Sequence, residues 1–148
     1  MAYTNLLTHI VFSTKDRRQS LTENVRPRVH QYLGGIVRNI KGTTITTGGV
    51  ADHVHMLVEL PPSVAISDAI RVIKSNSSKW IHEELDGLSS FQWQQKYGAF
   101  SVSRSNLARV AKYIDSQEEH HQKATFEGEF RGLLKRHGIM LDERYLWL

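Results

Sequence analysis

The segment ADHVHMLVEL at residues 51–60 places two histidines two positions apart in a run that is otherwise mostly apolar. In a β-strand, residues i and i+2 point to the same face, so His53 and His55 would project side by side. Two imidazoles at this spacing can bind one divalent metal, each through a ring nitrogen. A third ligand would then have to come from another part of the chain. The alternative is that both histidines are half-buried and hydrogen-bonded, with no metal.

A second segment whose side chains could take part in a reaction is VAKYIDSQEEHH at residues 110–121. Tyr113 and Gln117 are four residues apart, so they lie one turn apart on one side of a helix and border its apolar stripe. A phenol and an amide could therefore both face a site on the sheet. The alternative is a tyrosine at the edge of the core and a glutamine in water. His120 or His121 could approach the same metal, although an exposed helix end is the simpler interpretation. His9 has no partner that the sequence identifies.

Together the two segments could supply a metal, an oxygen ligand and a nucleophile. A phenol has a pKa of about 10 and is a poor nucleophile at neutral pH. It becomes useful where a cation neutralises the charge that gathers on the oxygens of a phosphodiester. Attack by such a tyrosine would leave a phosphotyrosine and a free 3′-hydroxyl. The stored bond would allow strands to be rejoined without ATP.

The elements that must position these side chains follow the order β-α-β-β-α-β, with further helices after it. We expect strands at 5–13, 43–50, 53–60 and 97–103, and helices at 22–39, 67–84, 105–121 and 125–137. The two-residue spacing between the second and third strands indicates an antiparallel hairpin. We therefore expect one α+β domain over residues 1–148. It would be a ferredoxin-like antiparallel sheet with helices on one face plus a C-terminal helix.

Composition excludes several classes of protein. The 148 residues include no cysteine, which excludes a disulfide scaffold, a thiolate metal site and a thiol nucleophile. No apolar run reaches the length of about 18 residues that a membrane helix needs, and the N-terminus lacks the pattern of a signal peptide. We therefore expect a soluble, cytoplasmic protein with no membrane association. The net charge of +4 is compatible with a polyanionic partner.

Basic and aromatic side chains could contact nucleic acid. Contacts to phosphate groups position a strand without reading its sequence, and solvated helix faces are an equally good explanation for each basic residue. The candidates for DNA binding are Lys15, Arg17, Arg18, Arg71, Lys74, Lys79 and Arg104. Aromatic rings could stack on unpaired bases. Among them, Trp80 is expected in the core, and Phe91 or Trp93 is expected to be more open.

Several of these segments carry a family resemblance. DHVHMLVELPP resembles the HUH motif (His, bulky hydrophobic, His) of the single-tyrosine transposases of small insertion sequences, the TnpA-like enzymes, and KYIDSQEEHH resembles their nucleophile helix. HIVFSTKDRR, IKSNSSKW and YGAFSVS also match, in the right order. The resemblance implies that His53, His55 and Gln117 bind Mg²⁺ or Mn²⁺ and that Tyr113 attacks DNA. It also implies a homodimer acting on single-stranded DNA with hairpin ends, with active sites that can combine the histidine pair of one subunit with the tyrosine helix of the other.

Three other functions share part of this pattern. A nickase of the replication-initiator or relaxase type uses the same HUH chemistry, but usually within a larger chain. A nucleotide hydrolase of the histidine-triad type needs a third histidine where Leu57 stands, so this function is excluded. A catalytically silent, domesticated DNA-binding protein would not need an intact set of His53, His55, Tyr113 and Gln117. A complete site can nevertheless be silent if the dimer fails to assemble.

Overall fold

The structure is a computed structural model that describes residues 2–122, 124–140 and 142. Its order of elements begins with the expected β-α-β-β-α-β unit and continues with three further helices. The strands are β1 (Leu7–Ser13), β2 (Thr43–Val50), β3 (His53–Glu59) and β4 (Gly98–Val102). The helices are α1 (Arg26–Asn39), α2 (Ile66–Glu84), α3 (Leu107–Asp115), α4 (Gln117–His121) and α5 (Phe126–Arg136), with short 3-10 turns η1 (Lys15–Arg17) and η2 (Arg104–Asn106).

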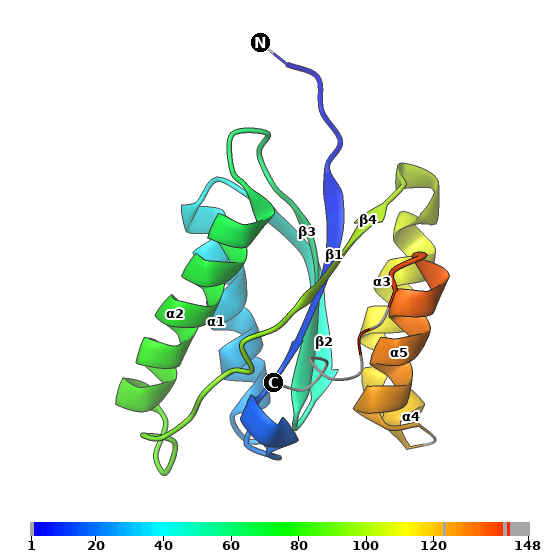
Figure 1. The fold of residues 1–148 in the computed structure, drawn as a ribbon. Coiled ribbons are helices and arrows are strands. Elements are labelled where there is room, and N and C mark those ends of the chain that lie inside the picture. Colours follow the sequence, from blue (N-terminus) through cyan, green and yellow to red (C-terminus); the bar gives the residue numbers. More distant parts are fainter. Residues whose placement is uncertain (1, 123, 141, 143–148) are drawn as a thin grey trace.

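The four strands form one antiparallel sheet in the order β2-β3-β1-β4. The strand that carries the histidine pair is therefore central, with Val11 of β1 opposite His55 and Ser13 opposite His53. Helices α1 and α2 cover one face of the sheet, as expected for a ferredoxin-like unit, and α3, α4 and α5 cover the other (Figure 1). Both faces of the central strands are thus covered by helices.

The alternation along β3 separates an apolar face from a polar one. Val54, Met56 and Val58 are buried in the larger core under α1 and α2. His53 and His55 point to the opposite face, where a smaller apolar cluster attaches α5 to the sheet. This smaller cluster consists of Val11, Phe100, Phe126, Phe130, Leu133 and Leu134. The expected two-faced strand is confirmed.

Helix α3 approaches the sheet closely because β2 carries a glycine beneath it. A Cβ atom added at Gly48 would lie 2.1 Å from the backbone oxygen of Ile114. Real Cβ atoms do not approach a backbone atom so closely, so any side chain here would push α3 away from the sheet. Gly48 therefore determines the distance between β2 and α3, the helix that carries Tyr113.

The single helix expected over 105–121 is divided at Ser116, where the backbone leaves the helical conformation. The Ser116 hydroxyl donates a hydrogen bond to the carbonyl oxygen of Lys112 at 2.8 Å, which competes with the helical ladder. Gln117 therefore begins a new short helix, α4, instead of continuing α3. Its side chain nevertheless remains beside Tyr113.

The expectation that Phe91 or Trp93 is open is wrong. Both side chains are buried in the larger core, because the loop after α2 folds back against the first strand. Trp93 forms an isolated bridge with Thr14, and its indole Nε1 donates to the Ser77 hydroxyl at 2.9 Å. Trp80 is only half-buried. Among the described residues, no helix has both the length and the apolar character of a membrane span.

Candidate metal and tyrosine site

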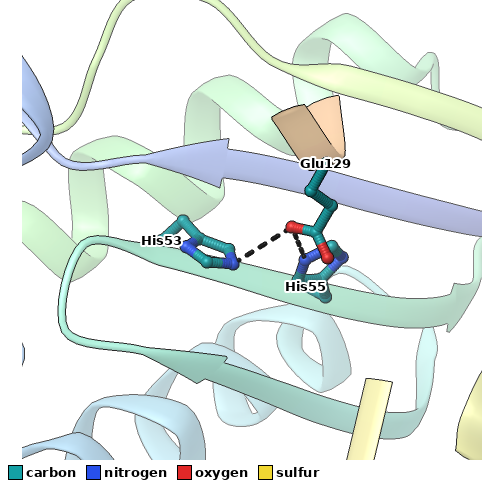
Figure 2. Close-up of side chains that lie close together, drawn as sticks. All are labelled: His53, His55 and Glu129. Atoms are coloured by element: carbon teal, nitrogen blue, oxygen red, sulfur yellow. Dashed lines mark hydrogen bonds and ion pairs between the residues drawn. The ribbon is translucent and has the colours of Figure 1, made fainter. Parts of the chain in front are cut away.

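The two histidines of β3 are fully buried and aim at one carboxylate. Figure 2 shows both rings extending from the strand towards Glu129 on α5. Glu129 Oε1 lies 3.2 Å from His53 Nε2 and 3.0 Å from His55 Nε2. One ligand atom from each of these three residues lies within 4.8 Å of the others, so the group could hold a metal ion.

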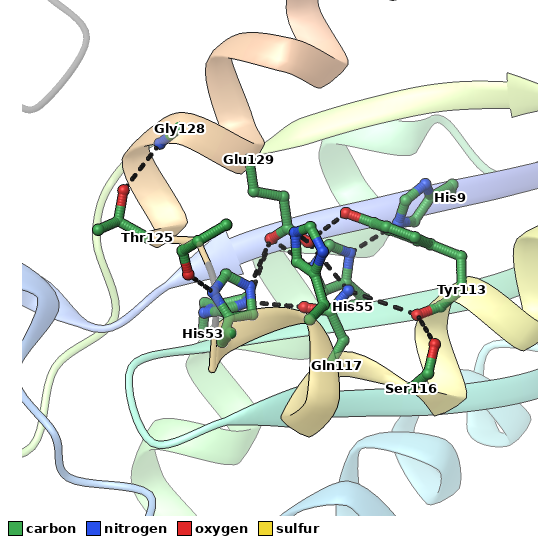
Figure 3. Close-up of polar contacts among 12 residues, drawn as sticks. His9, His53, His55, Tyr113, Ser116, Gln117, Thr125, Gly128 and Glu129 are labelled. Carbon is green, nitrogen blue, oxygen red and sulfur yellow. Dashed lines mark hydrogen bonds and ion pairs between the residues drawn. The ribbon is translucent and has the colours of Figure 1, made fainter.

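Glu129 is the centre of the polar network. Phe126, Phe130 and Leu133 fix α5 against the sheet, and they leave Glu129 only 5% exposed. Its Oε2 accepts hydrogen bonds from the Tyr113 hydroxyl and, at 2.9 Å, from Gln117 Nε2 (Figure 3). Burial would raise the pKa of this carboxyl, but hydrogen bonds from the surrounding histidines outweigh burial and hold the pKa well below its usual range. The buried group is therefore an ionised carboxylate.

The imidazoles of the site differ in their electrostatics. Burial lowers the pKa of His53, but hydrogen bonds with Asp52, at 2.8 Å, and Glu129 outweigh it and raise the pKa to about 9. Burial lowers the pKa of His55 below its usual value. His55 Nδ1 shares a hydrogen bond of 2.8 Å with His9 Nε2, and burial together with His55 lowers the pKa of His9 to about 3. His53 is therefore positively charged at neutral pH, with a hydrogen on both ring nitrogens, whereas His55 and His9 are neutral.

Tyr113 and Gln117 both lie beside the histidine pair, within the same chain. The rings of Tyr113 and His55 are 5.7 Å apart between centroids, and Gln117 Oε1 is 3.0 Å from His53 Nε2. Burial, followed by the hydrogen bond to Glu129, raises the pKa of Tyr113 above its usual value. The structure thus brings together the four residues singled out from the sequence, with a phenol that is protonated at neutral pH.

Two residues of the site, Glu129 and His9, were not assigned a role from the sequence, and for His121 an exposed helix end was the favoured interpretation. Glu129 is the most important, and its signal was a carboxylate inside the apolar stripe of the last helix. His9 precedes Val11 by two residues and therefore shares its face of the central strand. His121 Nε2 lies 3.1 Å from Glu129 Oε1, so the alternative in which this residue only ends a helix in solvent is not what the structure adopts.

The seven basic residues proposed for DNA contact are not gathered around the tyrosine. Arg71, Lys74 and Lys79 lie on α2, which covers the face of the sheet opposite the histidines (Figure 1). Lys74 donates hydrogen bonds to the carbonyl oxygens of Gln94, at 2.6 Å, and Lys96, at 2.9 Å, so it holds the loop after α2. DNA binding by this set stays a prediction.

A cavity of about 580 Å³ opens beside the tyrosine. His9, Phe100 and Tyr113 line it from the sheet and from α3, and Arg109 and Arg136 contribute positive charge. The cavity is large enough for part of a nucleotide, and its charge suits a phosphodiester.

The chemistry of the donor atoms fits a divalent cation. Imidazole nitrogens from His53 and His55 face a carboxylate oxygen of Glu129 and an amide oxygen of Gln117. Nitrogen and oxygen ligands of this kind bind first-row transition metals, and the oxygens also suit Mg²⁺. A cation here would neutralise the buried negative charge of Glu129.

Comparison with known proteins identifies the family. Residues 2–117 match the model of the family described as IS200-like transposases. The chain is 30% identical over 120 residues to the transposase of insertion sequence IS200 from Salmonella typhimurium, covering 78% of each protein. It is 29% identical over 118 residues to the ISDra2 transposase TnpA of Deinococcus radiodurans, covering 75% of this chain and 83% of that one.

Solved structures agree in fold. A Deinococcus radiodurans protein described as a transposase superposes with a TM-score of 0.66 at 24% identity, over 79% of this chain and 95% of that chain. A REP-associated tyrosine transposase, solved bound to a REP hairpin, superposes with a TM-score of 0.57 at 16% identity, over 77% of this chain and 70% of that chain. The sequence match to the family model covers most of the chain, including the histidine pair and Tyr113. The chain therefore belongs to the IS200-like transposase family.

Proposed function

We propose that this transposase is a metal-dependent enzyme that cleaves and rejoins single-stranded DNA at insertion-sequence ends through a 5′-phosphotyrosine on Tyr113. One observation carries the proposal. Tyr113, a phenol, shares a buried carboxylate with the two histidines of the HUH segment. A nucleophile and a candidate cation site thus meet at one point.

His53, His55, Gln117 and Glu129 would hold the cation, Mg²⁺ or Mn²⁺. When bound, such a cation neutralises the charge that develops on the oxygens of the phosphodiester. Asp52 fixes the ring of His53 through Nδ1, and His9 fixes the ring of His55 through Nδ1. These partners keep both Nε2 atoms aimed into the site, in the way that outer partners orient ligating histidines elsewhere.

The chain's own residues position the nucleophile. The Tyr113 hydroxyl donates its hydrogen bond to Glu129 Oε2, which fixes the direction of the phenol and holds its proton. In the proposed cleavage, the phenol gives its proton to Glu129 Oε2, and the phenolic oxygen forms a bond to phosphorus while the bond from phosphorus to the 3′ oxygen breaks. The departing oxygen gains a proton and becomes the 3′-hydroxyl. Attack of a 3′-hydroxyl on the phosphotyrosine reverses these bond changes and joins two ends.

The DNA strand would reach Tyr113 through the cavity that Arg109 and Arg136 border. The related REP-associated transposase was solved with a REP hairpin, which supports hairpin-bearing DNA as the substrate here. Homodimer formation remains part of the proposal.

We propose that the site is assembled within one chain, because Tyr113 already contacts Glu129 and packs near His55 in a single copy. Mixing His53→Gln chains with Tyr113→Phe chains tests this point. Cleavage should stay absent in the mixture if each site uses one chain. Restored cleavage would show that the tyrosine helix crosses to a partner.

The direct test of the function is a covalent adduct. Labelled single-stranded DNA from the flanks of the gene is incubated with the protein and Mg²⁺ or Mn²⁺, and the products are separated on a denaturing protein gel. Wild type should give a metal-dependent band that is absent in Tyr113→Phe. Tyr32→Phe is the matched control, because Tyr32 packs on Trp80 in the other layer and should react normally. DNA binding with no adduct under any metal would instead favour the catalytically silent alternative.

A further inference from the structure

Three imidazole nitrogens, not two, surround one oxygen of Glu129. His53 Nε2, His55 Nε2 and His121 Nε2 lie 3.2, 3.0 and 3.1 Å from Oε1. The third ring comes from α4, and Glu129 comes from α5, so both follow the segment that matches the family model. Among the described residues, two groups have ligand atoms within 4.8 Å of one another, His53–His55–Glu129 and His120–His121–Glu129, and they share Glu129. Helices α4 and α5 therefore supply candidate donor atoms next to the histidine pair.

The hydrogen bonds of His121 fix which of its nitrogens can bind a cation. Its Nδ1 lies 2.7 Å from the carbonyl oxygen of Ala124, and a carbonyl oxygen can only accept. Nδ1 therefore carries the hydrogen, and in the neutral ring Nε2 presents a lone pair to Glu129 Oε1. His53 likewise turns its Nδ1 to an acceptor, Asp52, so that Nε2 is the nitrogen that faces Glu129. Lone pairs that face a carboxylate oxygen repel it unless a proton or a cation lies between them.

The surroundings of His121 provide both rigidity and access. The Thr125 hydroxyl accepts a hydrogen bond from the backbone nitrogen of Gly128 at 3.2 Å and caps α5, which fixes the chain next to Ala124. A cavity of about 510 Å³ reaches His121 from outside, and Asp52 and Glu118 also line it. Arg26 lines the same cavity and pairs with Glu118 at 3.1 Å, so Asp52 and Glu23 supply the negative charge next to His121 that is left unpaired by that arginine.

We propose that His121 is a third imidazole ligand, which joins His53, His55, Glu129 and the amide oxygen of Gln117 in a site that selects a first-row transition metal over Mg²⁺. This inference rests on the metal site of the proposed function and specifies its ligand set and the class of its metal. Imidazole suits transition metals, whereas Mg²⁺ prefers oxygen ligands and retains several waters. The competing explanation is a charged His121 that forms only an ion pair with Glu129.

Titration calorimetry on the full chain at one fixed pH separates the two explanations. The probes are Co²⁺, Mn²⁺ and Mg²⁺, and the proteins are wild type, His121→Gln, His120→Gln and His53→Gln. His120 is the matched neighbour, because its Nε2 lies 3.4 Å from the other oxygen of Glu129. We expect wild type to bind Co²⁺ more tightly than Mg²⁺, and His121→Gln to weaken Co²⁺ binding by at least about 10-fold with Mg²⁺ binding unchanged. The visible absorption of bound Co²⁺ should also change in His121→Gln, because the spectrum reports the ligand set.

The outcomes distinguish this inference from the proposed function. If His53→Gln abolishes Co²⁺ binding but His121→Gln binds Co²⁺ with the affinity and spectrum of wild type, only the role of His121 is overturned. A loss in His120→Gln in place of His121→Gln overturns it as well, as does a wild type that prefers Mg²⁺. If His53→Gln binds every metal as wild type does, both the role of His121 and the metal site of the proposed function are overturned. Circular dichroism of each variant confirms that the proteins compared are folded.

Discussion

Replacing Gly48 with alanine should slow DNA cleavage far more than it weakens the fold. Gly48 lies in β2, directly under the helix that carries Tyr113. An added Cβ would lie 2.1 Å from the backbone oxygen of Ile114 and 2.9 Å from its carbonyl carbon. Both atoms belong to the main chain of α3, so no side-chain rotation can relieve the overlap. The helix itself has to move.

The size of the movement follows from these distances. Ordinary van der Waals contact of a Cβ atom begins at 3.4 Å, whereas the added Cβ would lie 2.1 Å from the Ile114 oxygen. Helix α3 must therefore move away from β2 by roughly 1.3 Å. Tyr113 precedes Ile114 and moves with it, away from Glu129 and the histidine pair. A displacement of about 1 Å at a reacting group can reduce a rate by about 100-fold. The cost in stability should be about 1–3 kcal/mol, as for other overpacked sites.

The assay compares the rate of covalent adduct formation with the free energy of unfolding in urea. Gly35→Ala is the matched control, because an added Cβ in this turn of α1 meets nothing within 4 Å. Gly35→Ala should gain about 0.5–1 kcal/mol of stability from the better helix propensity of alanine and should react at the wild-type rate. Gly48→Ala should remain folded and form the adduct about 100-fold more slowly.

A folded Gly48→Ala protein that forms the adduct at the wild-type rate would refute this reasoning. Such a result would mean that the tyrosine helix does not rest on Gly48 of its own chain when the reaction occurs. An unfolded Gly48→Ala protein would show that α3 cannot move away from the sheet. The expected stability cost would then be too small, and the rate comparison with Gly35→Ala could not be made.

Three further outcomes are expected from other parts of the molecule. Phe130→Ala should lose about 3 kcal/mol of stability in urea, because the ring is buried between α5 and the sheet, and should weaken metal binding in calorimetry. Arg136→Gln should reduce the slope of log affinity for single-stranded DNA against log salt by about 0.7, whereas Arg38→Gln, on α1, should not. Burial and the neighbouring Arg26 lower the pKa of His30 to about 4 from 6.5. The neutral form therefore stabilises the fold fully above pH 6.5 and progressively less as the pH falls towards 4, so urea midpoints over this range should fall less in His30→Leu than in wild type.

Local patterns predicted the part of the site that lies within single elements. The alternation of β3 placed His53 and His55 on one face, and helical spacing placed Tyr113 beside Gln117. Both arrangements depend on neighbours two to four residues away, so periodicity is sufficient to predict them. The same reasoning gave the order of strands and helices, because turns and apolar repeats are also local.

Contacts between distant segments could not be predicted in the same way. Phe91 and Trp93 lie in a stretch without strand or helix periodicity, which suggested an open loop. Their burial depends on Phe12 and Ser77, whose positions only the assembled sheet and α2 determine. The face chosen by α3 is a similar case, because its apolar stripe is compatible with either side of the sheet.

Glu129 shows which observation in the sequence could have revealed the rest of the site. A charged carboxylate on the buried stripe of a helix costs several kcal/mol unless it is paired, so a helix that keeps one between Phe126 and Phe130 must bury it against a partner. Two imidazoles on the covered face of an apolar strand are also costly to bury without a partner. They can carry a positive charge or bind a cation, whereas the carboxylate is negative. Each feature alone has an ordinary structural explanation. Their presence in one small domain favours a shared solution, in which the histidines of β3 and the carboxylate of α5 meet, and a cation between them satisfies both.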